Sequence, residues 1–216
     1  MLDIICKVCY NEEKRLENGM KIYDISQEVF GCVVFPGDPA PVKNTLRSMD
    51  KGDAINLTHF SMCAHNGTHL DAPFHFINDG KKIDELPLSK TVGYAYVADH
   101  EGTVSEDDIK AILEKAKKAC PESAKRILIK GKSTLSLEAS RVLAEERIDL
   151  YGNESQTVGP EEAPRATHLV LLGADVALLE GVRLSEVPEG VYLLSATPLC
   201  LGGAEGSPCR PVLIEL

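Results

Sequence analysis

Several features that are common in proteins are scarce in this chain. Its 216 residues include no tryptophan, and aromatic residues make up only 5% of the total, so aliphatic side chains must form most of the core. No apolar run reaches the ~18 residues that a membrane-spanning helix needs, which argues against an integral membrane protein. The first twenty residues also lack the charge order and the small-residue cleavage site of a secretory signal.

Positive charge is scarce as well. Lys and Arg number 23 against 33 Asp and Glu, which gives a net charge of −10. So acidic a chain is poorly suited to a phosphate backbone, and we expect no nucleic-acid partner. The seven cysteines are odd in number and scattered through a chain too long to need disulfides for stability. This pattern favours reduced thiols and a cytoplasmic protein.

The composition is that of one globular domain, with 44% hydrophobic and 26% charged residues. Residues 1–19 have the character of an N-terminal extension, and regular structure is expected from about Met20, so the domain is predicted to cover 20–216. Strand patterns dominate the first third, and strand and helix patterns alternate in the middle. We therefore predict a compact α/β domain with a mixed sheet flanked by helices.

Local signals place the individual elements. Ser105 with Asp108 three residues later matches the acidic variant of a capping box, and the apolar residues after it recur at helical spacing. Residues 127–129 (Ile-Leu-Ile) predict a short buried strand. Further strands are expected at 21–26, 54–58, 148–150, near 176, 191–196 and 211–216, and further helices at 137–146 and 165–173.

Three of the six histidines fall in the run AHNGTHLDAPFH at residues 64–75. A helix would bring His65 and His69 together, but Gly67 and Pro73 disfavour a helix here. In an extended segment, side chains alternate between the two faces of the strand. An extended run would therefore place four metal-ligating or proton-carrying side chains on one face, and Gly67 between them would leave room in front of the site. The four are His65, His69, Asp71 and His75.

Imidazoles together with a carboxylate suit Zn²⁺, with Mn²⁺ as a harder alternative. The competing interpretation is a buried polar cluster that backbone groups satisfy. Two residues farther along the chain support the metal-site interpretation only if they lie in the same site. His168 lies in a predicted helix, and Glu180 ends the apolar run 176–179. A carboxylate at the end of a buried strand is costly unless it is paired or bound to a cation.

Two other patterns are weaker. Cys6 and Cys9 form a lone C-x-x-C with no second pair at zinc-finger spacing. The Gly202–Gly206 segment, with Glu205 inside it, has the composition of a loop. It follows no strand-to-helix phosphate motif, so no nucleotide site is predicted there.

At residues 65–75 the sequence resembles the H-x-G-T-H-x-D-x-P-x-H signature of the metal-dependent cyclase family, which includes bacterial kynurenine formamidases (arylformamidases) and isatin hydrolases. Upstream, residues 23–26 (YDIS) and 35–38 (FPGD) resemble two further segments of that family. His168 and Glu180 stand at the spacing of its distal ligands. The resemblance extends over about residues 21–216.

The resemblance implies a role for each residue of the candidate site. His65, His69 and Asp71 would bind a first metal ion, with Asp71 able to bridge to a second ion bound by His168 and Glu180, and His75 would be the acid/base residue. The implied cofactor is one or two divalent ions, Zn²⁺ before Mn²⁺. The implied fold is a swivelling-type α/β domain that forms a homodimer or homotetramer with the active site near the interface.

The resemblance further implies hydrolysis of an amide C–N bond in a small molecule such as an arylformamide, an N-formylkynurenine-like compound or a cyclic amide. Phe35 stands where kynurenine formamidases often carry tryptophan. It is our candidate substrate-binding residue, but its identity weakens the case for kynurenine itself. Residues 152–155 also depart from the expected pattern. The alternatives are a metal-assisted cyclase or lactone hydrolase, and a non-catalytic domain that retains the metal.

Overall fold

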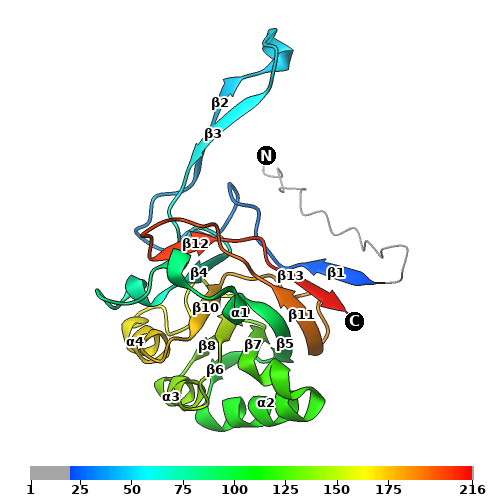
Figure 1. The fold of residues 1–216 in the computed structure, drawn as a ribbon, viewed down its shortest axis with the longest axis vertical. Helices are drawn as coiled ribbons and strands as arrows, with labels where there is room; N and C mark the ends of the chain where they lie inside the picture. Colours follow the sequence, from blue (N-terminus) through cyan, green and yellow to red (C-terminus); the bar gives the residue numbers. More distant parts are fainter. Residues whose placement is uncertain (1–19, 216) are drawn as a thin grey trace, which may run out of the picture.

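The computed structural model describes residues 20–215, and its centre is a nine-stranded mixed sheet with the order β1-β13-β11-β5-β7-β9-β10-β4-β12 (Figure 1). The four middle strands β5, β7, β9 and β10 are parallel, and the outer strands pair antiparallel. The strands of this sheet are β1 Lys21–Asp24, β4 His69–Asp71, β5 Val92–Asp99, β7 Arg126–Lys130, β9 Leu150–Asn153, β10 Ala177–Glu180, β11 Gly190–Ser195, β12 Gly206–Pro208 and β13 Val212–Glu215.

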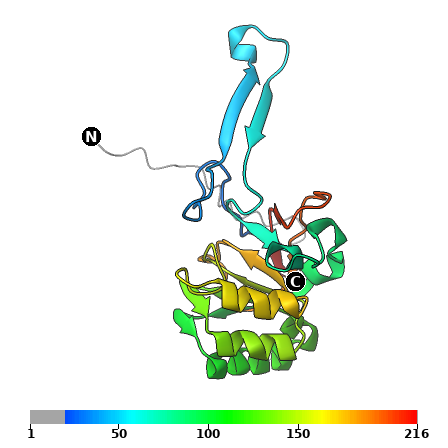
Figure 2. The same ribbon diagram turned by 90° about the vertical axis from the view of Figure 1, so that its left-hand side faces the viewer.

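Three crossover helices connect the parallel strands in chain order and lie along one face of the sheet (Figures 1 and 2). They are α2 (Glu106–Ala119), α3 (Leu137–Glu145) and α4 (Arg165–Gly173). A short helix, α1 (Leu88–Thr91), precedes β5, and strands β6 (Gly102–Val104) and β8 (Ser133–Leu135) form a small parallel pair. The predicted single α/β domain with a mixed sheet is thereby confirmed.

The core has two parts because the sheet is buried on both faces. In β5, Tyr96 and Ala98 pack in the cluster beneath the helices, whereas Ala95 and Val97 pack in the cluster on the opposite face. Strand β7 divides its apolar side chains in the same way. Burial on both faces explains why its sequence is a continuous apolar run rather than an alternating one.

The helix predictions agree closely with the structure. The Ser105 hydroxyl accepts a hydrogen bond from the Asp108 N–H, and the Asp108 carboxylate accepts one from the Ser105 N–H, so the capping box is formed. Helix α4 has the predicted bounds, and α3 ends one residue earlier than expected. No described helix is both long enough and apolar enough to cross a membrane.

Two strand predictions were wrong in position. The strand expected at 54–58 is β3 (Leu57–Ser61), and residues 54–56 belong to the turn before it. The strand expected at 148–150 starts only at Leu150, because the Ile148 N–H donates to the Leu143 carbonyl and so still closes α3. The predicted extension 1–19, with its C-x-x-C, lies outside the described residues.

An arm that the sequence did not predict extends away from the sheet (Figures 1 and 2). It consists of β2 (Val42–Arg47), the 3₁₀ turn 49–51 and β3, paired antiparallel. Every residue of both strands is exposed. The compact outline that we expected is therefore correct for the sheet and its helices but not for this two-stranded ribbon.

Candidate metal centre

The predicted site residues come from several separate segments of the chain. Strand β4 carries His69 and Asp71, and it pairs with β10 so that His69 lies opposite Glu180. Helix α4 carries His168 and packs beside β10. The structure therefore brings together two parts of the chain about a hundred residues apart, as the resemblance implied.

The extended conformation predicted for 65–75 was wrong. His65 lies in a turn, only residues 69–71 are a strand, and Pro73–His75 form a 3₁₀ helix. Proline is favoured at the first position of such a helix, and its ring fixes the backbone there. The four side chains converge through these changes of direction, so only His69 and Asp71 are related by strand alternation.

The role expected for Gly67 also needs correction. Its φ is +70°, which favours glycine, and a Cβ added there would lie 3.2 Å from the Cβ of Cys32. Gly67 therefore permits a left-handed turn and a close approach to Cys32, rather than leaving space in front of the candidate site. Its carbonyl oxygen lies 3.0 Å from His69 Nδ1, which donates to it.

Asp71 lies at the middle of the cluster. Its Oδ1 is 2.9 Å from His65 Nδ1 and 3.4 Å from His69 Nε2. Its Oδ2 is 3.7 Å from His168 Nε2. Glu180 completes the other side, with Oε2 3.3 Å from His69 Nε2 and Oε1 3.1 Å from His168 Nε2. Two triads result, His65–His69–Asp71 and Asp71–His168–Glu180, each with ligand atoms within 4.8 Å of one another.

The donor set fits a divalent cation. Asp71 is fully buried and Glu180 is 3% exposed, and two buried carboxylates need compensating positive charge. Asp71 Oδ2 has no hydrogen-bond partner among the described residues. In the competing interpretation, backbone groups donate hydrogen bonds to every polar atom of the cluster. No carboxylate oxygen at its centre would then lack a hydrogen-bond partner. Imidazole nitrogen and carboxylate oxygen are ligands that Zn²⁺ accepts readily.

The electrostatics show the same need for positive charge. Burial alone would lower the pKa of His69, but hydrogen bonds and charges from Asp71 and Glu180 outweigh it and raise the pKa to about 10. Burial also opposes protonation of His168, yet Glu180 raises its pKa to about 9. Burial would raise the pKa of Asp71, but His65 and His69 hold it well below its usual value. Without a metal ion, protons would supply the positive charge.

His75 lies against the cluster without joining either triad. Its ring centroid is 4.1 Å from that of His65 and 6.1 Å from that of His168. Burial is the main cause that lowers the pKa of His75, with the neighbouring imidazoles acting in the same direction. At neutral pH, this imidazole is therefore uncharged and able to accept a proton.

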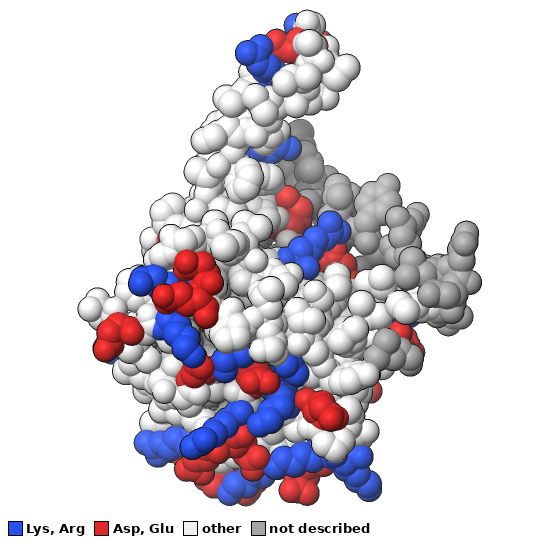
Figure 3. Space-filling model, in the orientation of Figure 1, with Lys and Arg blue, Asp and Glu red and all other residues white. Residues whose placement is uncertain are grey.

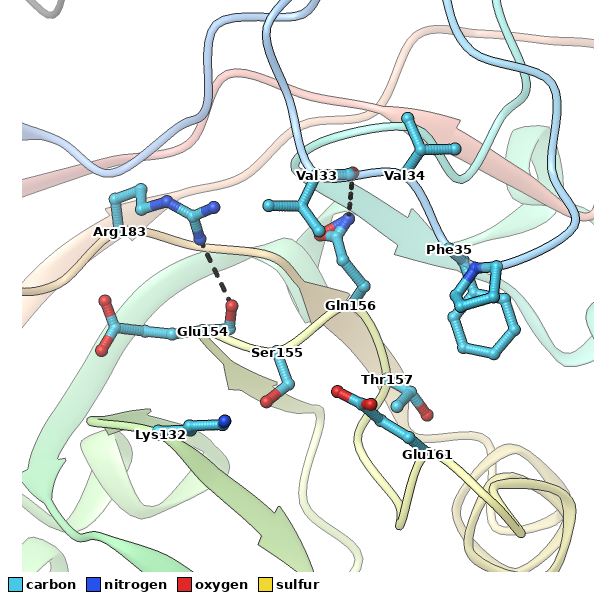
Figure 4. Close-up of a pocket in the computed structure, with 11 residues that line it drawn as sticks. Val33, Val34, Phe35, Lys132, Glu154, Ser155, Gln156, Thr157, Glu161 and Arg183 are labelled. Carbon is cyan, nitrogen blue, oxygen red and sulfur yellow. Dashed lines mark hydrogen bonds between the residues drawn. The ribbon is translucent and has the colours of Figure 1, made fainter. Parts of the chain in front are cut away.

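Phe35 lies in a different place from the cluster, in the wall of a cavity of about 460 Å³ (Figure 4). Lys132, Arg183 and the segment from Glu154 to Thr157 also line this cavity. No residue of either triad is among the described residues of its wall. The cavity approaches the cluster through Thr157, because the N–H of the next residue, Val158, donates to Glu180 Oε1 at 2.9 Å.

One residue that touches the cluster was not expected from the sequence. Glu205 Oε1 lies 3.1 Å from His65 Nε2. The contact spans 140 positions, and a glutamate in a glycine-rich loop carries no local signal for it. Only the pairing of β12 with β4 reveals the proximity.

The fold and the site together define a class, a mixed α/β protein with a buried histidine–carboxylate centre. The sequence profile of the Cyclase family matches residues 16–160. The chain is 34% identical over 207 residues to the kynurenine formamidase of Bacillus anthracis, which covers 89% of this chain and 97% of that protein. The chain belongs to the Cyclase family.

Solved structures agree with this assignment. A protein described as a potential metal-dependent hydrolase with cyclase activity superposes with a TM-score of 0.77 at 27% identity, over 91% of this chain and 98% of the other. Isatin hydrolase A from Labrenzia aggregata superposes with a TM-score of 0.76 at 23% identity, over 90% and 93%. The similarity to isatin hydrolase A shows a shared fold.

Proposed function

We propose that the protein is a metal-dependent hydrolase of an amide C–N bond in a small molecule. The observation that carries the proposal is the pair of triads that share the buried Asp71, one oxygen of which has no hydrogen-bond partner among the described residues. The similarity to a kynurenine formamidase supports the bond type. An arylformamide or a cyclic amide is the substrate class that we infer.

The cofactor in this proposal is Zn²⁺, with one ion at each triad or a single ion at one of them, and Mn²⁺ is the alternative. Three imidazoles and two carboxylates form a donor set suited to zinc. A bound divalent ion lowers the pKa of water and polarises a carbonyl oxygen, which are the two requirements of amide hydrolysis.

His75 moves the proton in this mechanism. Because its imidazole is neutral at physiological pH, it can accept a proton from the attacking water and then donate that proton to the leaving nitrogen. Its ring lies beside His65 at the edge of the first triad, where a substrate carbonyl would approach. The cavity beside Phe35, which approaches the centre on the Glu180 side, is where the rest of the substrate would lie (Figure 4).

Metal removal and reconstitution test the proposal. Protein stripped with a chelator should lose hydrolysis of N-formylkynurenine and of isatin, and Zn²⁺ or Mn²⁺ should restore it. Asp71→Asn should hold less metal than native protein and stay inactive after reconstitution, because both triads lose their shared anion. Equal activity of stripped and reconstituted protein on both substrates would refute the proposal.

A cyclase or lactone hydrolase is the second candidate, because one structural relative is described as having cyclase activity. The same centre could polarise a carbonyl without consuming water. Mass spectrometry of the product separates the two reactions, since hydrolysis adds one water and cyclodehydration removes one.

We also propose that the protein works as a homodimer or homotetramer in which the arm, residues 42–61, contacts a second copy. An isolated two-stranded ribbon is marginally stable in water. Apolar side chains nevertheless stand exposed along this one, among them Leu46, 60% exposed, and Phe60, 52% exposed. The shaft of the arm carries few charges in Figure 3. Its charged residues are Lys43, Arg47 and Lys51 together with Asp50 and Asp53, which gives the arm a net charge of +1 in a chain of net charge −10.

A cytoplasmic location is the last part of the proposal. Cys32, Cys63, Cys120, Cys200 and Cys209 are free thiols in the described part of the chain. Free thiols in this number are typical of a reducing compartment. Fractionation of the cells that make the protein would test the location directly.

A further inference from the structure

The three histidines of the triads share one arrangement. Each turns one ring nitrogen toward the central carboxylates and offers the other to an acceptor of the protein. For His69 and His168 these acceptors are backbone carbonyls, those of Gly67 at 3.0 Å and Pro164 at 2.8 Å. For His65 the acceptor is a side chain, because its Nε2 lies 3.1 Å from Glu205 Oε1 while its Nδ1 faces Asp71.

The backbone of β12 holds Glu205 in this position. Gly206 pairs with Asp71 in the antiparallel ladder between β12 and β4, and the Ala72 N–H donates to the Glu205 carbonyl at 2.9 Å. The preceding residue is fixed as well, since the Ile83 N–H donates to the Ala204 carbonyl at 2.9 Å. The carboxylate of Glu205 therefore extends from an anchored backbone.

Gly206 lets the imidazole of His65 lie directly against β12. A Cβ at this position would be 2.7 Å from His65 Cε1, a distance that atoms in real structures do not adopt. The same Cβ would be 2.9 Å from the Leu70 carbonyl oxygen. The glycine and the glutamate before it thus form a cradle for His65, the first contacting the ring edge and the second its nitrogen.

We propose that Glu205 is a positioning residue for His65, a carboxylate that accepts the Nε2–H and so directs the Nδ1 lone pair toward the metal at the first triad. An outer-shell carboxylate on a metal-bound imidazole fixes its tautomer and orientation and strengthens it as a ligand. Glu205 itself is not one of the triad residues. Its side chain is 40% exposed, whereas that of Asp71 is fully buried, so it lies at the rim of the centre.

The inference rests on the proposed metal centre, and metal affinity rather than turnover tests it. The affinity of stripped full-length protein for Zn²⁺ is measured by competition with a chromogenic chelator, and its Co²⁺ form is examined by visible spectroscopy. Glu205→Ala should bind the ion of the first triad about 10–100-fold more weakly than native protein and show an altered Co²⁺ spectrum. Glu205→Gln should recover part of the affinity, because its amide oxygen still accepts the hydrogen bond. Glu162→Ala, at an exposed glutamate before α4, is the matched control and should bind as native protein does.

The outcomes separate this inference from the metal proposal. If Glu205→Ala binds Zn²⁺ like native protein with an unchanged Co²⁺ spectrum, the positioning role is wrong and the metal centre stands. If Glu205→Gln loses as much affinity as Glu205→Ala, acceptance of the Nε2–H is not what strengthens metal binding, and the positioning role is again wrong. If native protein binds neither Zn²⁺ nor Co²⁺, both proposals fail. Glu205→Gln also keeps the test valid if Glu205→Ala does not fold, because the two side chains have nearly the same shape.

Discussion

Asp71 is the residue at which the two parts of the centre meet. Its two oxygens face different histidines, Oδ1 toward His65 and His69 and Oδ2 toward His168. The spacing of the motif predicted which residue types would gather, because imidazole and carboxylate groups so close in sequence seldom lie far apart in space. The manner of their convergence was not predictable from strand alternation, since Gly67 and Pro73 turn the chain on either side of β4.

His75 gives the sharpest prediction at the scale of a single residue. His75→Ala should reduce turnover by about 10²–10⁴-fold, because the proton donor for the leaving nitrogen is lost. Its metal content should stay that of native protein, since His75 belongs to neither triad. Steady-state kinetics and metal analysis of the same preparation measure both effects.

His100→Ala serves as the control, because His100 follows β5 and lies outside the site. Unchanged turnover in His75→Ala would exclude a role for this imidazole in proton transfer. Loss of the metal together with the activity would instead make His75 a ligand.

At the scale of elements, local sequence signals were sufficient to predict an element that begins at a capping residue and has a buried apolar face of its own. Helix α2 has both, a capping box at Ser105 and four buried apolar residues at helical spacing. The arm has no buried face, because all residues of its strands are exposed, so its local pattern indicated one strand at 54–58 but not the two-stranded ribbon. The local sequence of the arm therefore does not determine where the arm lies in the fold.

The cap of α2 can be tested directly. Ser105→Ala should lower the free energy of unfolding by about 1 kcal/mol, because the Asp108 N–H at the first turn loses its acceptor. Denaturant unfolding followed by circular dichroism measures the change, and Ser105→Thr, which keeps a capping oxygen, should restore most of it. A stability equal to that of native protein would mean that the cap contributes nothing in this context.

The exposed apolar side chains of the arm lead to a prediction about the oligomeric state. Changing Leu46 and Ile55, both exposed on the arm, to lysine should convert an oligomer into a monomer, because two charges would enter an apolar interface. Sedimentation velocity measures the result. Leu88→Lys is the matched control, because Leu88 is 57% exposed at the start of α1 and away from the arm, and it should leave the assembly unchanged. A monomeric native protein would contradict the proposed role of the arm.

For the whole molecule, the raised pKa values of the buried histidines link stability to pH. His69 and His168 have pKa values of about 10 and about 9 in the folded chain, against about 6.5 in an unfolded one. The stability that their protons confer is fully present below pH 6.5 and is lost as the pH rises through 9 to 10. Metal-free protein should therefore become easier to unfold between pH 6.5 and 10.

Denaturant titrations of chelator-treated protein at several pH values measure this trend. Zinc-loaded protein should vary less over the same range, because the ion replaces the protons, and its binding at pH 7 should release protons into the buffer. Calorimetry in buffers of different ionisation enthalpy detects that release. A metal-free protein whose stability rises with pH over this interval would show that the histidines are not protonated in the fold.

Because β4 carries candidate ligands at one end of a long stretch of chain and α4 and β10 carry them at the other, a bound ion would act as a cross-link. It would close a loop of about a hundred residues, which removes conformational freedom from the unfolded chain as a disulfide does. A polypeptide cleaved once between residues 76 and 164 would keep its two pieces joined through the ion. Chelation would remove this link, and the two pieces would then be held by strand pairing and core packing alone, including the pairing of β4 with β10 and β12.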